Sequence, residues 1–343
     1  MRTTPSRLNA LLMLAAAFAV AACGSSPAKA PVHTPTPSAT PSATPTATPT
    51  PVPSPAPVGM AAPIMIQVEN LWAARPQSGL AQADVVYEYQ TEGGISRFTA
   101  IFFHVPGGNV GPVRSARLVT IKLLRVYGGT LLYSGGTVYV STLLAHSGLR
   151  QFDESQAAGT LFRVAGRDAP HNLYSDSRHL AAFEARTSHT VGYQLWARTA
   201  LTSLPAGSSP LGTFQVPLSA YERPIFSYDG HSGHYTRTEP DTGVLVDANS
   251  GLPWRPSTIA ILQMPITVGP EVEDPSGAHG LDFGLIGSGA GQLAMGGRLY
   301  PIRWTQGASG PPQFTLANGQ PAPVAPGQML IELVPAGQGV LAH

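Results

Sequence analysis

The sequence is poor in cysteine and in charge. Cys23 is its single cysteine, and charged residues make up 11% of the chain, against roughly a quarter in a typical soluble domain. Because Cys23 lies near the N-terminus, a folded part that begins later contains no thiol, which excludes disulfides, cysteine nucleophiles and cysteine-based zinc sites there. Residues 60–343 contain one lysine, Lys122, and carry 17 Lys and Arg against 19 Asp and Glu. No basic surface for a polyanion stands out in this balance, so nucleic acid is not an expected partner.

The N-terminal residues follow the order of a bacterial lipoprotein leader. Arg2 and Arg7 precede an apolar run over 11–20, which is too short to span a bilayer as a mature helix but has the length of a signal-peptide core. Small residues then lead directly into Cys23-Gly24, which resembles the lipobox at which the cysteine is acylated and becomes the new N-terminus. We therefore expect a signal peptide over 1–22 and an extracytoplasmic protein anchored to a membrane by lipidated Cys23. An ordinary secretory signal followed by a chance cysteine is the alternative.

Residues 23–59 are predicted to form a disordered tether behind the lipidated cysteine. The segment consists mostly of Pro, Thr, Ser and Ala, with ten prolines between Pro31 and Pro57. Such a composition cannot bury a core and favours extended, polyproline-like conformations of about 3.1 Å per residue. About 35 residues would then reach on the order of 100 Å, which is enough to hold a domain away from its membrane.

The first half of the remaining chain mixes strand and helix patterns. The predicted elements are strands over 84–89, 97–103 and 131–133 and helices over 118–126, 138–146 and 177–186. Gly93-Gly94 separates the first two strands and predicts a hairpin, and Ser115 and Ser177 are expected to cap two of the helices. This order indicates an α/β (α+β) architecture.

The second half is predicted to be rich in β-strands. From residue 214 on, short apolar runs alternate with Gly, Pro and Asp turns, as in an all-β unit. The predicted strands cover 225–228, 235–238, 259–263, 296–304 and 329–335.

Several motifs in residues 60–343 carry a resemblance. They include Ala74-Arg75-Pro76-Gln77-Ser78-Gly79, Glu92-Gly93-Gly94-Ile95-Ser96-Arg97-Phe98, Gly111-Pro112-Val113-Arg114-Ser115-Ala116-Arg117 and Arg167-Asp168-Ala169-Pro170-His171-Asn172. In this order they resemble the YerB-like lipoproteins, the DUF3048 family, and the likeness continues through Phe226-Ser227-Tyr228-Asp229 and Pro326-Gly327-Gln328-Met329. The resemblance implies an envelope lipoprotein with an α/β domain over 60–212 and a β-rich domain over 213–343, and it brings no established chemistry. The chain departs from the family pattern at residues 67–72 and before Ser134.

The candidate site residues are charged or polar side chains within these motifs: Arg75, Glu92, Arg97, Arg114, Ser115, Arg117, His171 and Asn172. Arginines beside free backbone N–H groups at the start of a helix favour an anion or carboxylate site. If the loops meet, Glu92 or His171 has the chemistry of a general base. The structural alternative is that Glu92, Arg97 and Arg114 pair with one another and that Asn172 ties a loop.

Three further patterns are read as structural. Gly287-Ser288-Gly289-Ala290-Gly291 lacks the spacing and context of a dinucleotide fingerprint and is interpreted as a β-turn cluster, so no nucleotide cofactor is expected. Asp229, His231 and His234 stand in a glycine-rich hairpin tip without a second ligand cluster, and no metal or other cofactor is expected. The aromatic residues of the second half, among them Trp254 and Trp304, are interpreted as core packing, with a carbohydrate-stacking face as the alternative.

Three functions stay open on this evidence. The first is a non-catalytic, lipid-anchored protein that binds a cell-wall component such as peptidoglycan or an envelope protein. The second is a hydrolase or lyase that acts on wall material through Glu92 or His171 with Arg114 and Arg117. The third is a purely structural scaffold.

Overall fold

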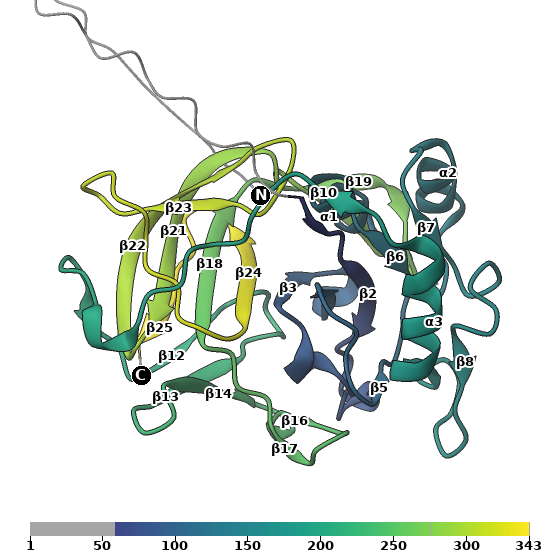
Figure 1. Cartoon of the computed structure of the whole chain (residues 1–343), viewed down its shortest axis with the longest axis horizontal. Coiled ribbons are helices and arrows are strands. Elements are labelled where there is room, and N and C mark those ends of the chain that lie inside the picture. The colour runs from purple at the N-terminus through teal and green to yellow at the C-terminus, as the bar shows by residue number, and fades with distance from the viewer. Residues whose placement is uncertain (1–58, 275, 343) are drawn as a thin grey trace, which may run out of the picture. The chain divides into compact units, whose positions relative to one another are not determined.

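The computed structural model describes residues 59–274 and 276–342. The signal peptide, Cys23 and the tether over 23–58 lie outside the described residues. The described residues form one compact unit, in which a large mixed sheet carries three α-helices near the end that contains β6 and β7 (Figure 1).

An eleven-stranded sheet runs through this unit and takes strands from both halves of the sequence. Its order is β11 (Ser209–Pro210), β22 (Arg298–Gln306), β21 (Gly287–Met295), β18 (Thr258–Met264), β24 (Met329–Pro335), β3 (Val85–Gln90), β4 (Ser96–Phe102), β2 (Ile64–Glu69), β6 (Thr130–Leu132) and β7 (Gln151–Phe152), with β23 (Gln313–Thr315) on β22. The halves join where β24 pairs in parallel with β3, from Met329 opposite Val85 to Leu333 opposite Tyr89. The division into 60–212 and 213–343 therefore separates segments that share one sheet.

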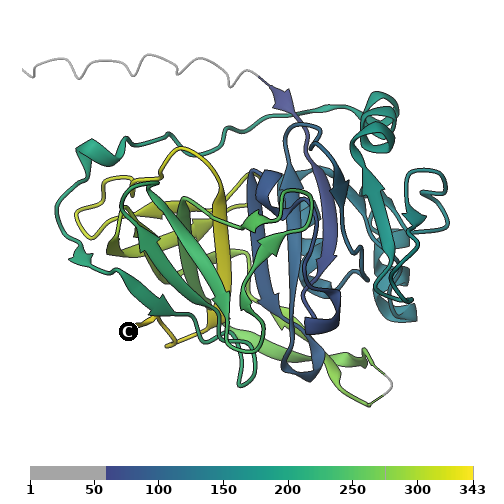
Figure 2. The same ribbon diagram turned by 90° about the horizontal axis from the view of Figure 1, so that it is seen from below.

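Smaller sheets pack around the large one, and Figure 2 shows them from below. A five-stranded sheet has the order β15 (Gly243–Val244), β14 (His234–Glu239), β13 (Ile225–Asp229), β12 (Thr213–Gln215) and β25 (Leu341–Ala342). A three-stranded sheet has the order β5 (Asn109–Val110), β9 (Leu173–Asp176) and β8 (Phe162–Arg163). The two-stranded pairs are β1 (Met60–Ala61) with β10 (Thr190–Val191), β16 (Val246–Asp247) with β17 (Leu252–Pro253), and β19 (Ile266–Val272) with β20 (His279–Phe283).

The helices are α1 (Leu118–Tyr127), α2 (Val138–His146) and α3 (Ser177–Thr187), with single 3-10 turns η1 (Trp72–Ala74), η2 (Leu80–Gln82), η3 (Glu92–Gly94) and η4 (Leu201–Ser203). The α/β (α+β) and β-rich reading of the two halves is confirmed, and so are the predicted hairpin and helices. The expected caps are wrong. Arg117 is the N-cap of α1, and its N–H donates to Thr120 Oγ1 at 2.9 Å, while the Asp176 carboxylate accepts from His179 N at the start of α3.

The two faces of the large sheet bury two separate cores. Because successive strand residues point to opposite faces, Ile101 of β4 packs in the core that contains α1, whereas Ala100 and Phe102 pack in the other. This second core is closed by the five-stranded sheet and by α3. None of the helices in residues 59–274 and 276–342 combines the length and apolarity needed to cross a bilayer.

The aromatic residues of the second half belong to these cores. Tyr235, Trp254, Tyr300 and Trp304 are all buried, so their interpretation as core packing is confirmed and they form no stacking face. The glycine-rich residues 287–291 open strand β21 and pair with β22, so the expected turn there is wrong.

Candidate functional site

Three clusters of charged side chains lie at one end of β2, β3 and β4. We name them after their central residues. The Glu69 cluster contains Glu69, Arg114 and His171; the Glu92 cluster contains Glu92, Arg97, Arg117 and Glu273; the Arg237 cluster contains Arg237, Glu88, Glu222, Glu239, Glu332 and Arg75. Glu69 of β2 lies directly opposite Arg97 of β4, so the first two clusters occupy the sheet face that carries α1. Glu88 is one residue out of that row and points to the other face.

The Glu92 cluster is a buried ion-pair network at the start of α1. Both carboxylate oxygens of Glu92 accept hydrogen bonds from Arg117, and Arg97 lies 3.9 Å from the same carboxylate. Burial opposes ionisation of Glu92, but the hydrogen bonds from Arg117 and the charge of Arg97 lower its pKa below the usual value. Burial and the positive charge of Arg117 lower the pKa of Arg97 to about 10. Glu92 is therefore held as a paired carboxylate, a poor general base.

The Glu69 cluster is the more open of the two on this face. Glu69 is buried, and its Oε1 lies 3.1 Å from Arg114 Nε while its Oε2 lies 2.8 Å from His171 Nδ1. The side chains of Arg114 and His171 are 25% and 20% exposed. Among the described residues, His171 Nε2 has no hydrogen-bond partner, so the carboxylate fixes the ring and leaves one nitrogen to a ligand.

The Arg237 cluster is closed from solvent and holds more carboxylates than arginines. The fully buried Arg237 donates to Glu88 and Glu239, while Arg75 lies 3.1 Å from Glu222 and 3.5 Å from Glu239. The guanidinium of Arg237 also lies over the rings of Phe98, Phe226 and Trp254, within 5.3 to 5.7 Å of each centroid.

The surplus negative charge in the Arg237 cluster shifts two of its carboxyl groups. Burial and the neighbouring Glu239 and Glu88 raise the pKa of Glu222 to about 9. Burial and Glu88 raise the pKa of Glu332 well above its usual value, while the arginines hold Glu239 ionised against its burial. A pKa of about 9 keeps Glu222 protonated at neutral pH, and the raised pKa of Glu332 favours its neutral form, which brings the number of negative charges closer to that of the two arginines.

Six of the eight predicted site residues thus divide among the three clusters, and Ser115 and Asn172 lie outside them. Arg114 pairs with Glu69 and Arg117 with Glu92, so the two arginines do not converge on one anion. Ser115 contributes its carbonyl oxygen, which accepts from Arg97 Nη1 at 3.0 Å, and its hydroxyl lies 3.4 Å from that of Ser134. Asn172 Oδ1 accepts from Arg163 at 2.6 Å and ties its loop.

Sequence reasoning missed the acidic partners of these arginines. Glu69 lies in the 67–72 segment that departs from the family pattern, and it alone brings Arg114 and His171 together. Glu88, Glu239 and Glu332 stand in strands that otherwise read as apolar or alternating, and a charge inside such a strand is a signal of a buried partner. Arg237, their common partner, lies in one of the quoted strands but offers no local hint of its burial.

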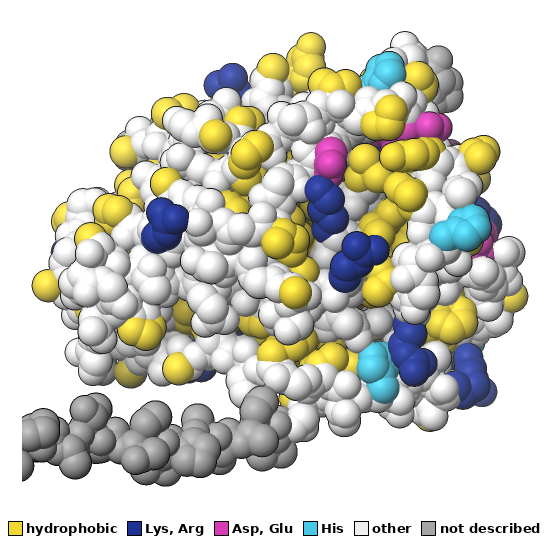
Figure 3. Space-filling model, turned by 90° about the horizontal axis from the view of Figure 1, so that it is seen from above, with side chains coloured by type: hydrophobic (Ala, Val, Ile, Leu, Met, Phe, Trp, Pro, Cys, Tyr) yellow, Lys and Arg dark blue, Asp and Glu magenta, His cyan; other side chains and the backbone are white. Residues whose placement is uncertain are grey.

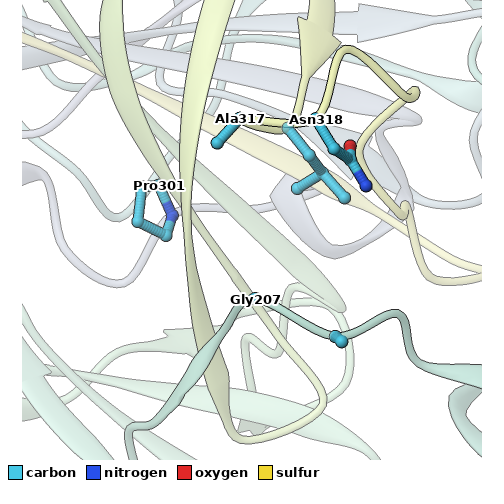
Figure 4. Close-up of a pocket in the computed structure, with 6 residues that line it drawn as sticks. Gly207, Pro301, Ala317 and Asn318 are labelled. Atoms are coloured by element: carbon cyan, nitrogen blue, oxygen red, sulfur yellow. The ribbon is translucent and has the colours of Figure 1, made fainter.

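Surface hollows outside the clusters offer little chemistry. A hollow of about 270 Å³ between the 206–207 loop, β22 and the 316–318 turn is lined by small or apolar groups and one polar side chain, Asn318 (Figure 4). In the part of the chain that is described, no group of three or more His, Cys, Asp or Glu is arranged to hold a metal ion.

On the face over α1 and α2, apolar side chains gather beside basic side chains (Figure 3). Two adjacent hollows of about 240 and 220 Å³ share Lys122 and Arg125. Leu143 and Ile286, which line these hollows, are exposed, and so is Val138 at the start of α2. We call this surface the α1–α2 face.

Comparison with known proteins identifies the family. Residues 49–191 match the model of the N-terminal domain of the protein family of unknown function DUF3048, and residues 214–331 match the model of its C-terminal domain. The chain belongs to the DUF3048 family. It is 28% identical over 283 residues to the putative lipoprotein YerB of Bacillus subtilis (strain 168), a match that covers 80% of this chain and 81% of YerB. The crystal structure of the YerB protein from Bacillus subtilis is similar at a TM-score of 0.66 and 25% identity, over 80% of this chain and 90% of that one. The resemblance read from the motifs is confirmed.

Proposed function

We propose that this DUF3048 protein is a lipid-anchored, extracytoplasmic and non-catalytic binding protein of the bacterial envelope. The anchor is Cys23, supported by the leader sequence and by the likeness to a putative lipoprotein. The ligand is a carboxylate-bearing cell-wall component, with peptidoglycan as the first candidate.

The Glu69 cluster carries this proposal. Arg114 keeps a quarter of its side chain in solvent and His171 keeps a free Nε2, while the buried Glu69 holds both in place. The Arg114 guanidinium offers donors to a carboxylate, while His171 Nε2 accepts from a neighbouring N–H or O–H of the ligand because Nδ1–H donates to Glu69, and their fixed geometry limits the entropy lost on binding. The peptide stems of peptidoglycan carry such carboxylates.

Binding is favoured over catalysis by the state of Glu92. Both carboxylate oxygens of Glu92 accept hydrogen bonds from Arg117, and Glu92 and His171 belong to separate clusters. A hydrolase or lyase that needs these two groups on one substrate therefore finds less support in the geometry than a ligand site at Arg114 and His171.

The test is co-sedimentation of the unlipidated chain, residues 24–343, with isolated peptidoglycan. We expect the wild-type protein to pellet and Arg114→Ala to weaken binding at least tenfold, while the matched control Arg125→Ala on α1 binds as the wild type does. Equal pelleting of wild type and Arg114→Ala contradicts the site. Release of soluble wall fragments contradicts the non-catalytic assignment.

The α1–α2 face supports a second candidate, an envelope protein partner. Exposed apolar side chains beside Lys122 and Arg125 are typical of an interaction surface. A photo-crosslinker at Leu143 in cells is expected to capture an envelope protein that the same crosslinker at Leu252, an exposed leucine of β17, does not capture. Identical products from both positions argue against this face.

A further inference from the structure

An exposed tryptophan lines a hollow that the proposed function does not use, and Arg75 of the Arg237 cluster forms part of its wall. Trp72 in the turn η1 is 66% exposed, and with Tyr221 it is one of the two most exposed aromatic side chains in the described residues. The hollow, of about 250 Å³, lies between Trp72, Arg75 and Pro76 on one side and Thr242 and Val244 on the other. We call it the Trp72 hollow.

The charge of the Trp72 hollow is already balanced. The side chain of Arg75 donates to Asn70, Glu222, Asp241 and Thr242, so its guanidinium is fully engaged. Its role is to position Asp241 and Thr242 at the edge of the hollow. An anionic ligand would find no unpaired cation here, which separates this hollow from the Glu69 cluster.

Thr242 lines the Trp72 hollow, and the carboxylate of Asp241, its neighbour in the sequence, is held next to it by Arg75. Asp241 is 56% exposed, and its Oδ1 accepts from Arg75 Nη1 at 2.9 Å. Its Oδ2 has no hydrogen-bond donor among the described residues. An oriented carboxylate oxygen beside the Thr242 hydroxyl accepts hydrogen bonds from ligand hydroxyls.

An exposed indole, an apolar wall at Val244 and an oriented carboxylate together suit a sugar ring. The ring presents C–H groups to an aromatic face and hydroxyls to acceptors at its edge. The hollow is smaller than the roughly 300–1,000 Å³ of pockets for drug-sized ligands, so it suits a single ring. We propose that the Trp72 hollow binds one ring of a neutral glycan strand.

The segment from Glu69 to Pro76 connects the Trp72 hollow to the Glu69 cluster. Asn70 Oδ1, next to Glu69, accepts from Arg75 Nε at 3.1 Å. Arg167, in the loop that carries His171, donates to the carbonyl oxygens of Ala74 and Pro76 at 2.8 and 2.9 Å. A glycan with an acidic peptide attached would engage both sites, and in this respect the inference rests on the proposed function. The sugar site itself stands on the geometry of the hollow.

The experiment is titration of the unlipidated chain with chitotetraose, a neutral N-acetylglucosamine oligomer, by isothermal calorimetry and tryptophan fluorescence. We expect saturable heat and a change in emission, because Trp72 is the most exposed tryptophan, while Trp196 is half-buried against Phe314 and Trp254 and Trp304 are buried. Trp72→Ala and Asp241→Ala are expected to weaken binding at least tenfold, and Trp72→Phe to retain it within a few-fold. Tyr221→Ala, which removes the other exposed aromatic ring, is the matched control and is expected to bind as the wild type does.

The binding of chitotetraose by wild type and variants also shows which results would overturn the glycan site. No binding by wild type, or equal binding by Trp72→Ala, overturns the glycan site, and unchanged thermal unfolding of the variants excludes misfolding as a cause. Arg114→Ala is expected to bind chitotetraose as the wild type does, because the oligomer carries no carboxylate. Loss of binding in Arg114→Ala overturns the assignment to Trp72. Failure of the peptidoglycan experiment with chitotetraose binding intact removes the Glu69 ligand site and leaves the glycan site.

Discussion

The Arg237 cluster and the Glu69 cluster both pair arginine with glutamate at the same end of β2 and β3, yet they differ in access to solvent. Arg237 and three of its carboxyl partners are almost completely buried, and aromatic rings surround the guanidinium. Arg114 and His171 are partly exposed above a buried carboxylate. The difference arises from a one-residue step along the strands, which directs Glu88 toward the five-stranded sheet and Glu69 toward the face of α1.

The two clusters differ in burial, and they are therefore expected to differ in their contribution to stability and in their availability to a ligand. An ion pair inside a protein stabilises weakly as a whole, but removal of one partner leaves an unpaired buried charge. A partly exposed pair contributes little to stability, and its donors stay available to a ligand. We therefore propose that the Arg237 cluster maintains the fold and that the Glu69 cluster binds the ligand.

The largest loss of stability is expected from a mutation in the Arg237 cluster. Arg237→Ala leaves Glu88 and Glu239 buried without their partner and is expected to lower the free energy of unfolding by about 3–5 kcal/mol. Urea denaturation of the unlipidated chain measures this loss. The double variant Arg237→Met with Glu88→Gln is expected to recover part of it, and a loss below about 1 kcal/mol in Arg237→Ala alone would contradict the structural role.

The pH dependence of stability distinguishes Glu222, whose pKa is raised in the fold, from Glu92, whose pKa is lowered. The pKa of Glu222 is raised to about 9 in the fold, so the stability that its protonation contributes is fully present below the unfolded pKa and is lost progressively as the pH rises through about 9. Relative to wild type, Glu222→Gln is therefore expected to become progressively more stable from about pH 5 to pH 9, by at most about 1.4 kcal/mol per pH unit.

Glu92 serves as the comparison in that pH series. Its pKa is lowered in the fold, so its contribution is present at neutral pH and is lost as pH falls through the folded value. The stability advantage of wild type over Glu92→Gln is expected to shrink in acid. If the stabilities of the Glu222 and Glu92 variants changed with pH in the same direction, the opposite pKa shifts assigned to the Arg237 cluster and the Glu92 cluster would be wrong.

A smaller effect is expected at the start of α1, where Thr120 Oγ1 accepts from Arg117 N. Thr120→Val keeps the shape of the side chain but removes this bond, and the expected loss is about 1 kcal/mol. Because the bond positions Arg117 beside Glu92, thermal unfolding is expected to move while peptidoglycan binding stays unchanged. A loss of binding without a loss of stability would place Arg117 in the ligand site.

The smallest effect on stability is expected from a mutation in the Glu69 cluster. Arg114→Ala is expected to change the free energy of unfolding by less than about 1 kcal/mol, because the guanidinium is partly solvated. Urea denaturation beside the Arg237 variant gives the direct comparison. A loss as large as that of Arg237→Ala would make Arg114 a structural residue.

Local signals in the sequence predicted most of the elements. The Gly93-Gly94 pair between two strand-like runs placed the hairpin of β3 and β4, and the predicted helix over 118–126 ends one residue later in the structure, before Gly128 with its positive φ of 59°. The N-caps were missed because serines nearby offered the same chemistry as Thr120 and Asp176. The parallel pairing of β24 with β3 joins residues more than 240 positions apart, and no local pattern reports it.

The candidate site was predictable only in part. Arg114 and His171 stood out as polar residues in glycine- and proline-marked loops, but their common partner Glu69 lies at the end of a buried strand. Which arginine meets which carboxylate depends on strand register, and a shift of one residue would exchange the faces of Glu69 and Glu88. The sequence therefore supplied the residue types and left their pairing to the fold.

The most direct test of the central claim is a ¹⁵N NMR titration of the His171 ring in the unlipidated chain with a soluble muropeptide. The account predicts a saturable shift of the Nε2 resonance that disappears in Arg114→Ala and when the peptide carboxylates of the same muropeptide are amidated. Binding that leaves Nε2 unmoved, or an equal shift with the amidated muropeptide, would contradict the assignment of the open cluster to a carboxylate ligand.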